Sequence, residues 1–303
     1  MNSHLTLTPS RPSRPTRPLR RALSLLLTVL ALAHPAFAAD VTRDLEYARV
    51  GDLPLKLDLY RPKTPRPLLI VYVHGGAWRG GTKAEFPLGG LVTEGFAVAS
   101  IDYRLSNQAP FPAQAHDIKA AIRFLRAQQT QLGINAQRIV IAGASAGGHL
   151  AAIVGVTNGN KELEGTVGDH LDQSSDVQGI ISLFGASDLQ TILGQSTEKG
   201  VKMRAPALQL LLGGSPTEKP DLARLASPVA HIDAHDPPLL LIHGDADPQM
   251  PPEQSKELAA AYEKAGLSVK LSVIPGAVHG GKQFYDPERL ALMKDFLYTL
   301  IPY

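Results

Sequence analysis

A serine between two glycines is the first candidate for a catalytic nucleophile in this sequence. The segment Gly143-Ala144-Ser145-Ala146-Gly147 matches the pattern Gly-x-Ser-x-Gly, and it connects the apolar run 138–142 to a predicted helix. Small residues on both sides of the serine allow a tight strand-to-helix turn that exposes its hydroxyl group. The same pattern also occurs in turns with a spectator serine, so the assignment depends on finding a base and an oxyanion hole.

A second glycine-rich segment could supply the oxyanion hole. His74-Gly75-Gly76-Ala77-Trp78 directly follows the apolar run 68–73. Because glycines let the backbone approach a developing alkoxide closely, we expect N–H groups of Gly76 and Ala77, or of Gly75 and Gly76, to donate there together with that of Ala146. A phosphate-binding loop is the alternative, but neither a Gly-Lys-Ser/Thr ending nor a Gly-x-Gly-x-x-Gly pattern follows.

A serine nucleophile needs a histidine base, and that base needs an acid to hold its tautomer. Two segments that follow apolar runs supply them: 243–248 contains Asp245 and Asp247, and 277–280 contains His279. We favour Asp247 over Asp245, which begins its loop and is placed to bond its own backbone. Every other histidine precedes Asp247, so His279 alone fits the chain order Ser, Asp, His.

The elements that must position these residues alternate between short apolar runs and longer amphipathic segments. Residues 41–60 predict an antiparallel hairpin with its turn at Gly51-Asp52, and 113–129 predicts a helix. Further strands are predicted at 68–73, 97–101, 138–142, 179–184, 238–243 and 268–274. This alternation indicates an α/β fold with a mostly parallel, doubly wound sheet.

About fifty residues separate two of these strands, which is longer than an ordinary crossover. We expect residues 186–236 to form a lid-like insertion with short helices over the active site, although a plain crossover with loops has the same length. Two aromatic residues near the predicted site, Trp78 and Phe184, are candidates for substrate contacts or for packing in the core.

The first 38 residues predict a secretory signal peptide. They contain five arginines and no acidic residue, then an apolar run over 22–33 and a small-x-small cleavage signal at Ala36-Phe37-Ala38. The apolar run is too short for a membrane anchor, which needs about 20 residues. We therefore expect residues 39–303 to be one catalytic domain, exported to the periplasm or the medium and without stable insertion in a membrane.

Composition excludes several functional classes. The chain has 303 residues, 44% of them hydrophobic, and loss of the five leader arginines changes its formal charge from +2 to −3 (+2 − 5 = −3). No nucleic-acid partner is expected at that charge. The chain has no cysteine, and prolines surround His231 and His235, so no metal or other cofactor is predicted. Nothing in the sequence indicates an oligomeric state.

From about Leu68 to Tyr285 the sequence resembles carboxylesterases with a His-Gly-Gly loop, the hormone-sensitive-lipase-like group. Within that group it is most similar to bacterial carbohydrate esterases described as bifunctional acetylxylan and feruloyl esterases. The resemblance rests on seven motifs, at 74–83, Asp102-Tyr103-Arg104-Leu105, Phe111-Pro112-Ala113-Gln114, 143–149, Ser227-Pro228, 243–247 and 276–280.

The resemblance implies an α/β-hydrolase fold, with an esterase triad at Ser145, Asp247 and His279. It implies a small-molecule or oligosaccharide ester as substrate, with acetyl or feruloyl groups on plant polysaccharides as the expected acyl groups. The loop reads Gly-Gly-Ala-Trp where lipase-like relatives have three glycines. General short-chain carboxylesterases, amidases or peptidases, formamidases of the kynurenine type and non-catalytic binding proteins are the alternatives.

Overall fold

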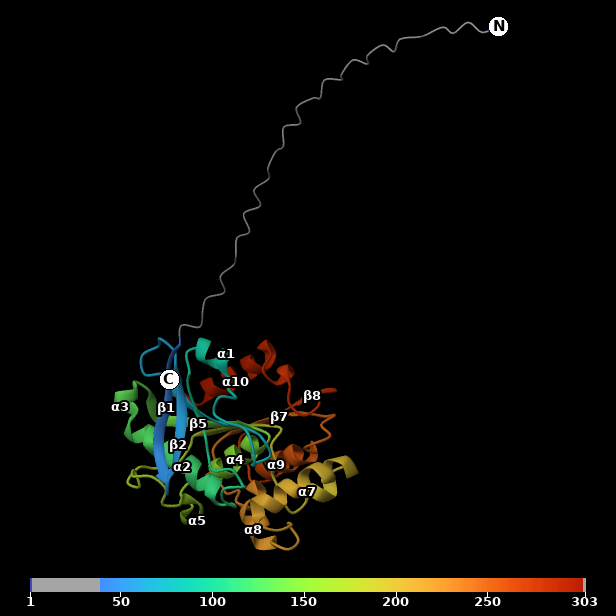
Figure 1. Cartoon of the computed structure of the whole chain (residues 1–303). Coiled ribbons are helices and arrows are strands. Elements are labelled where there is room, and N and C mark those ends of the chain that lie inside the picture. The colour runs from blue at the N-terminus through green and yellow to red at the C-terminus, as the bar shows by residue number, and fades with distance from the viewer. Residues whose placement is uncertain (2–38, 302–303) are drawn as a thin grey trace. The chain divides into compact units, whose positions relative to one another are not determined.

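A single mixed sheet organises residues 39–301 in the computed structural model (Figure 1), which describes Met1 and residues 39–301. The predicted signal peptide and its cleavage site lie outside the described residues, except for Met1. The strand order is β1-β2-β4-β3-β5-β6-β7-β8. The strands are β1 (Asp40–Val50), β2 (Leu53–Arg61), β3 (Leu68–Val73), β4 (Ala97–Ile101), β5 (Asn135–Ala144), β6 (Gly179–Leu183), β7 (Leu239–Gly244) and β8 (Val269–Ile274).

The strands pair as the hydrophobic patterns predict. β1 and β2 form the expected antiparallel hairpin around Gly51-Asp52, and β2 continues antiparallel onto β4. From β4 through β3 to β8 all pairs are parallel. Parallel strands covered on both faces need apolar side chains on both faces, which explains the continuous apolar run 68–73. The predicted mostly parallel sheet is therefore confirmed.

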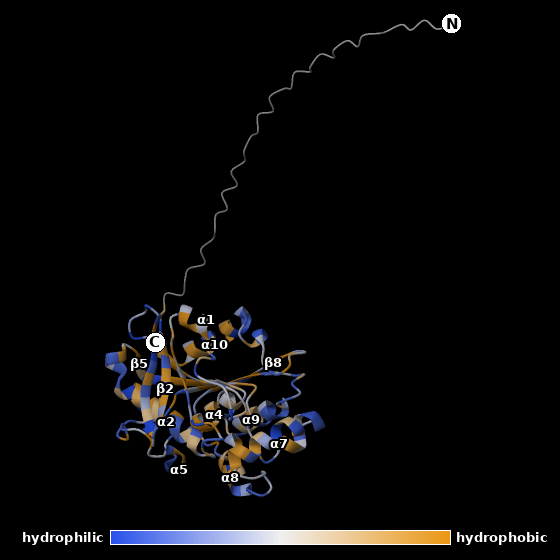
Figure 2. Cartoon of the chain, viewed as in Figure 1, coloured by the Kyte–Doolittle hydropathy of each residue, from blue (hydrophilic) through white to orange (hydrophobic). Residues whose placement is uncertain are grey.

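Helices cover both faces of the sheet, and each face has its own apolar core. Leu69, Val71 and Val73 of β3 pack in the core under α2, α4 and α9, whereas Ile70 and Tyr72 pack under α1 and α10. Figure 2 shows hydrophobic residues along the central strands and hydrophilic ones on outer helices such as α7. The helices outside the insertion are α1 (Gly89–Thr93), α2 (Ala113–Ala127), α3 (Gln129–Leu132), α4 (Ala146–Gly155), α5 (Lys161–Glu164), α9 (Glu253–Lys264), η2 (Lys282–Phe284) and α10 (Pro287–Thr299).

The expected insertion between β6 and β7 is helical. It contains α6 (Ile192–Gln195), α7 (Glu198–Leu212), α8 (Pro220–Leu225) and the short 3-10 helix η1 (Pro228–Ala230). The hydroxyl of Thr197 caps the start of α7, and Gly213 ends that helix with a positive φ of 66°. These end signals fix α7 as a helix of fifteen residues, so a plain loop does not describe this segment.

The candidate catalytic residues follow the carboxyl ends of β3, β5, β7 and β8. Loops at these strand ends meet along one edge of a parallel sheet, where α/β proteins bind ligands. None of the helices that the structure describes is long and apolar enough to cross a lipid bilayer.

Burial of β5, the strand that leads to Ser145, predicts that its side chains contribute strongly to the free energy of unfolding. Ile141 of β5 is fully buried, so Ile141→Ala should lower the free energy of unfolding by about 2 to 5 kcal/mol in urea titrations. Val273→Ala on β8 is the control, because Val273 is 40% exposed and its loss should cost about 0.5 kcal/mol or less. Equal losses for both variants would contradict the assignment of Ile141 to the core.

Candidate active site

Ser145 lies in a sharp turn between β5 and α4. Its backbone has φ 56° and ψ −118°, a conformation that costs energy for a residue with a side chain. A Cβ on Gly147 would lie 2.0 Å from the carbonyl oxygen of Val73, and one on Gly143 would lie 2.1 Å from that of Gly147. The two glycines of the Gly-x-Ser-x-Gly pattern are therefore required by close backbone contacts, and the turn raises the hydroxyl of Ser145 into the cavity above the sheet.

The structure brings Ser145, His279 and Asp247 together in one chain of hydrogen bonds. The Oγ of Ser145 lies 2.8 Å from Nε2 of His279, and Nδ1 of His279 lies 2.6 Å from Oδ2 of Asp247. Since the carboxylate can only accept, Nδ1 carries the proton and Nε2 is free to accept the proton of the serine. This is the arrangement of a nucleophile, its general base and the acid that orients the base.

The carboxylate of Asp247 is buried and ionised. Burial by itself would raise its pKa, but hydrogen bonds from His243 and His279, the charge of His279 and the N–H of Met250 hold the pKa well below the usual range. The other candidate, Asp245, is exposed and accepts a hydrogen bond from the N–H of Gly276. The structure thus places Asp247, and not Asp245, against the histidine.

The glycine-rich loop after β3 lies beside the nucleophile. Gly75, Gly76 and Ala77 line the same cavity as Ser145, and a Cβ on Gly75 would approach the carbonyl oxygen of Ala144 to 2.9 Å. Positive φ values of 105° at Gly76 and 52° at Ala77 turn the loop. Ala146 begins α4, so its N–H has no acceptor inside the helix. The four residues predicted for the oxyanion hole are therefore grouped around the serine.

The prediction that Trp78 contacts substrate is wrong. Its ring is fully buried and is absent from the cavity wall, and its Nε1 donates to Nδ1 of His149 over 3.1 Å. In turn, Nε2 of His149 donates to the carbonyl oxygen of Ala226 over 2.6 Å. A buried indole gains both from its large apolar area and from a partner for its N–H. Trp78 therefore anchors the loop to α4, which carries His149.

The motif that follows β4 supports the same loop. The ring of Tyr103 stacks on that of His74 with centroids 4.5 Å apart, and its hydroxyl donates to the carbonyl oxygen of His74 over 3.1 Å. Arg104 in turn makes a bidentate contact with the buried carboxylate of Asp117 on α2. Both ends of the loop, at His74 and at Trp78, are thus held by buried contacts.

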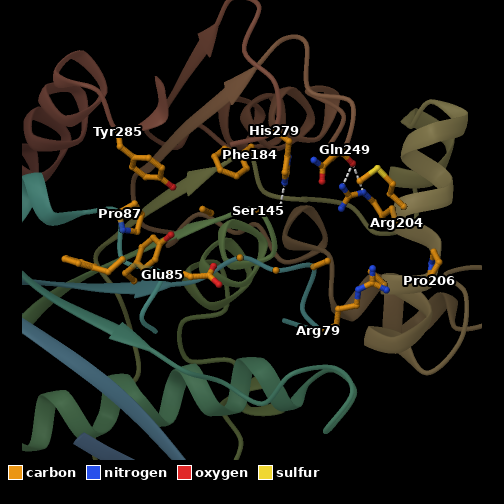
Figure 3. A pocket seen from close by; sticks show the side chains of 18 of the residues that line it. Arg79, Glu85, Pro87, Ser145, Phe184, Arg204, Pro206, Gln249, His279 and Tyr285 are labelled. Atoms are coloured by element: carbon orange, nitrogen blue, oxygen red, sulfur yellow. Dashed lines mark hydrogen bonds between the residues drawn. The ribbon is translucent and has the colours of Figure 1, made fainter. Parts of the chain in front are cut away.

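The cavity at Ser145 has a volume of about 720 Å³ (Figure 3). Phe184, the other predicted substrate contact, lines it, with its ring centroid 4.9 Å from that of His279. Sequence reasoning missed the remaining side chains of the wall. They come from β3, the segments after it, α7, the loop after β7 and the residue that follows η2: Tyr72, Arg79, Glu85, Phe86, Pro87, Lys202, Met203, Arg204, Pro206, Ala207, Gln249 and Tyr285.

Within residues 39–301, His, Asp and Glu residues form no group of three that could hold a metal ion. His231, considered above with His235, bonds the carbonyl oxygen of Leu225 through Nε2. The arrangement at Ser145 combines a nucleophile, a general base and backbone N–H donors, which are the groups that acyl transfer to a serine requires.

This fold and site define a serine hydrolase of the α/β-hydrolase class. A family model described as BD-FAE matches residues 57–262, and the chain belongs to this family of α/β-hydrolase esterases. It spans 58% of the length of two curated esterases of Mycobacterium tuberculosis, to which it is 31% identical.

Three solved structures share the fold. A truncated carbohydrate esterase from gut microbiota has a TM-score of 0.76 and 32% identity, with 86% of this chain and 96% of that chain covered. A bifunctional GH43-CE protein of Bacteroides eggerthii has a TM-score of 0.77 and 36% identity, with coverages of 86% and 35%. The propionate-bound esterase Est2 of Thermogutta terrifontis has a TM-score of 0.69 and 31% identity, with coverages of 89% and 98%.

Substitution of the two aspartates separates their roles. Asp247→Asn should lower kcat for a p-nitrophenyl ester about 10³- to 10⁴-fold, because an amide does not hold the histidine in the tautomer that accepts the serine proton. Asp245→Asn keeps an oxygen for the N–H of Gly276 and should leave kcat nearly unchanged. A larger loss at Asp245 than at Asp247 would contradict the triad.

The buried contact of His149 predicts a pH dependence of stability. Burial lowers the pKa of His149 from 6.5 to about 4, although the carbonyl of Ala226 opposes this. Between pH 6.5 and 4 the unfolded chain therefore binds a proton at His149 that the folded chain does not bind. The free energy of unfolding is unaffected by this group above about pH 6.5 and falls by about 3 kcal/mol as the pH drops to 4. Urea titrations should show a flatter profile for His149→Gln, and an unchanged one for His235→Gln, whose histidine is exposed.

Proposed function

We propose that the protein is an exported serine carboxylic ester hydrolase that removes acetyl or feruloyl groups from plant polysaccharide fragments. The observation that carries the substrate class is the likeness, at 32% and 36% identity, to proteins whose names include carbohydrate esterase or CE. The wall of the cavity is consistent with a sugar ester, because it combines aromatic side chains such as Tyr285 with charged ones such as Glu85 and Arg79. Its volume of about 720 Å³ is in the range of small-molecule sites.

The reaction follows from the geometry of the triad. Ser145 Oγ attacks the ester carbonyl while Nε2 of His279 takes its proton, and N–H groups of the loop 75–77 and of Ala146 stabilise the negative oxygen. His279 then returns the proton to the departing sugar oxygen, which leaves an acyl group on Ser145. Water activated by the same imidazole hydrolyses this acyl-enzyme and regenerates the serine.

A second candidate function is the hydrolysis of simple short-chain esters. It is favoured by the likeness to Est2, for which propionate-bound and butyrate-bound structures are known. The two candidates share the whole mechanism and differ only in the alcohol that leaves.

Release of acetate and ferulate separates them. The purified protein should release acetate from acetylated xylan or ferulate from feruloylated arabinoxylan fragments, and Ser145→Ala should remove this activity because it lacks the nucleophile. Parallel assays with short and long p-nitrophenyl esters and with an acetanilide should give turnover that falls with acyl length and little amide cleavage.

Activity confined to the synthetic esters would retain the mechanism and overturn the carbohydrate assignment. Faster cleavage of the anilide than of the matching ester would favour an amidase instead. Release that persists in Ser145→Ala would contradict the nucleophile itself.

A further inference from the structure

The charged side chains of the cavity are divided between two sides of Ser145. Figure 3 shows Arg79 and Arg204 on one side of the serine, and Glu85 with Tyr285 on the other. Lys202 also lines the cavity and precedes Arg204 by two residues on α7. The cavity therefore has a positive side, formed by α7 and by Arg79 at the end of the oxyanion loop (residues 74–78). The opposite side carries the carboxylate of Glu85.

Within residues 39–301, the buried guanidinium of Arg204 makes no salt bridge with a carboxylate. The residue is only 8% exposed, and its Nε and Nη2 both donate to the carbonyl oxygen of Gln249. Among residues 39–301, nothing accepts a hydrogen bond from its Nη1 and no salt bridge includes it. Burial lowers the pKa of Arg204 to about 10, with the charge of Asp247 opposing, so the group stays protonated at neutral pH. Asp247 makes no salt bridge with Arg204, so burial of the cation is only partly compensated, and an anion in the cavity that contacts the guanidinium would offset more of the cost.

The two neighbouring cations are also unpaired within the described part of the chain. Arg79 and Lys202 are exposed, and neither side chain makes a hydrogen bond or a salt bridge there. Away from the cavity, the two other buried cations of residues 39–301, Lys119 and Arg123, both pair with the carboxylate of Glu164. Among the described residues, Arg204 is thus the one buried cation that makes no salt bridge.

We propose that the preferred ester substrate carries a carboxylate, which binds at Arg204 with Arg79 and Lys202 adding positive potential. This inference rests on the proposed function, and on a sugar ester the carboxylate is that of a uronic acid residue near the acylated sugar. A guanidinium binds a carboxylate through charge-assisted and often bidentate hydrogen bonds. Glu85 on the opposite side repels the same group, so the charges also orient the substrate.

A purely structural role of Arg204 is the alternative. By holding the carbonyl of Gln249, Arg204 supports the loop in which the N–H groups of Gln249 and Met250 donate to Asp247. Loss of that support would lower turnover of all esters by the same factor. A role in binding an anion would instead lower turnover of anionic esters more than that of neutral ones.

Matched pairs of esters measure this difference. The carboxylate lies on the alcohol side in 4-acetoxybenzoate, with its methyl ester as the neutral partner, and on the acyl side in p-nitrophenyl hemisuccinate, with p-nitrophenyl methyl succinate as partner. For each pair the readout is the kcat/KM of the anionic ester divided by that of the neutral ester. Comparing this ratio between variants cancels the intrinsic reactivity of the esters.

In at least one pair, Arg204→Met should lower the ratio about tenfold, and Arg79→Gln and Lys202→Gln about two- to fivefold each, as expected for buried and exposed charges. The wild-type ratio in that pair should also fall as salt increases. Lys199→Gln is the control, since Lys199 lies on the same helix, is exposed and is absent from the cavity wall. If Arg204→Met does not fold, the double variant Arg79→Gln/Lys202→Gln provides the test.

Unchanged ratios in both pairs, or a loss in Arg204→Met that is equal for anionic and neutral esters, would overturn the proposal. So would the same change in ratio in Lys199→Gln. Acetylated xylo-oligosaccharides with and without glucuronic acid side groups then test the natural substrate class. Equal release from both would overturn this inference alone, whereas release from neither, together with no ferulate from feruloylated arabinoxylan fragments, would overturn the proposed function.

Discussion

The strained backbone of Ser145 is the constraint on which the site depends. A positive φ at a residue with a side chain persists only where neighbouring structure enforces it. Here the enforcement comes from contacts that only glycine allows, with Gly147 against the end of β3 and Gly143 against Gly147. The same contacts that raise the serine also bring the end of β3, and so the oxyanion loop, to within reach of the reacting carbonyl.

A chain of buried polar contacts holds that loop in place. Trp78, His149 and the carbonyl of Ala226 join the oxyanion loop, the nucleophile helix and the end of the helical insertion. These hydrogen bonds require the imidazole of His149 to be neutral with its proton on Nε2, because Nδ1 accepts from the indole of Trp78 and Nε2 donates to the carbonyl of Ala226. A histidine next to the nucleophile motif thus has a structural role, while the catalytic histidine is supplied from 134 residues away.

The helical insertion contributes side chains to the site. α7 supplies Arg204, whose guanidinium bonds the loop that carries Asp247, and it forms one wall of the cavity. The fold and the triad are thus common to serine esterases, whereas the positive charge of the cavity comes from α7 of the insertion and from Arg79. Substrate choice in such a fold depends on these added segments and not on the sheet.

The sequence by itself determined the elements whose signals are local. Apolar runs placed the strands, Gly51-Asp52 placed the hairpin turn, and short contiguous motifs with a fixed chain order indicated Ser145, Asp247 and His279. Tertiary structure alone decided that Trp78 is buried, that α7 reaches the cavity, and that Arg204 makes no salt bridge with any of residues 39–301. Burial and pairing depend on which distant segments meet, and no local pattern encodes that. The triad and the oxyanion loop could therefore be predicted from the sequence, whereas most of the other side chains in the cavity wall, apart from Phe184, could not.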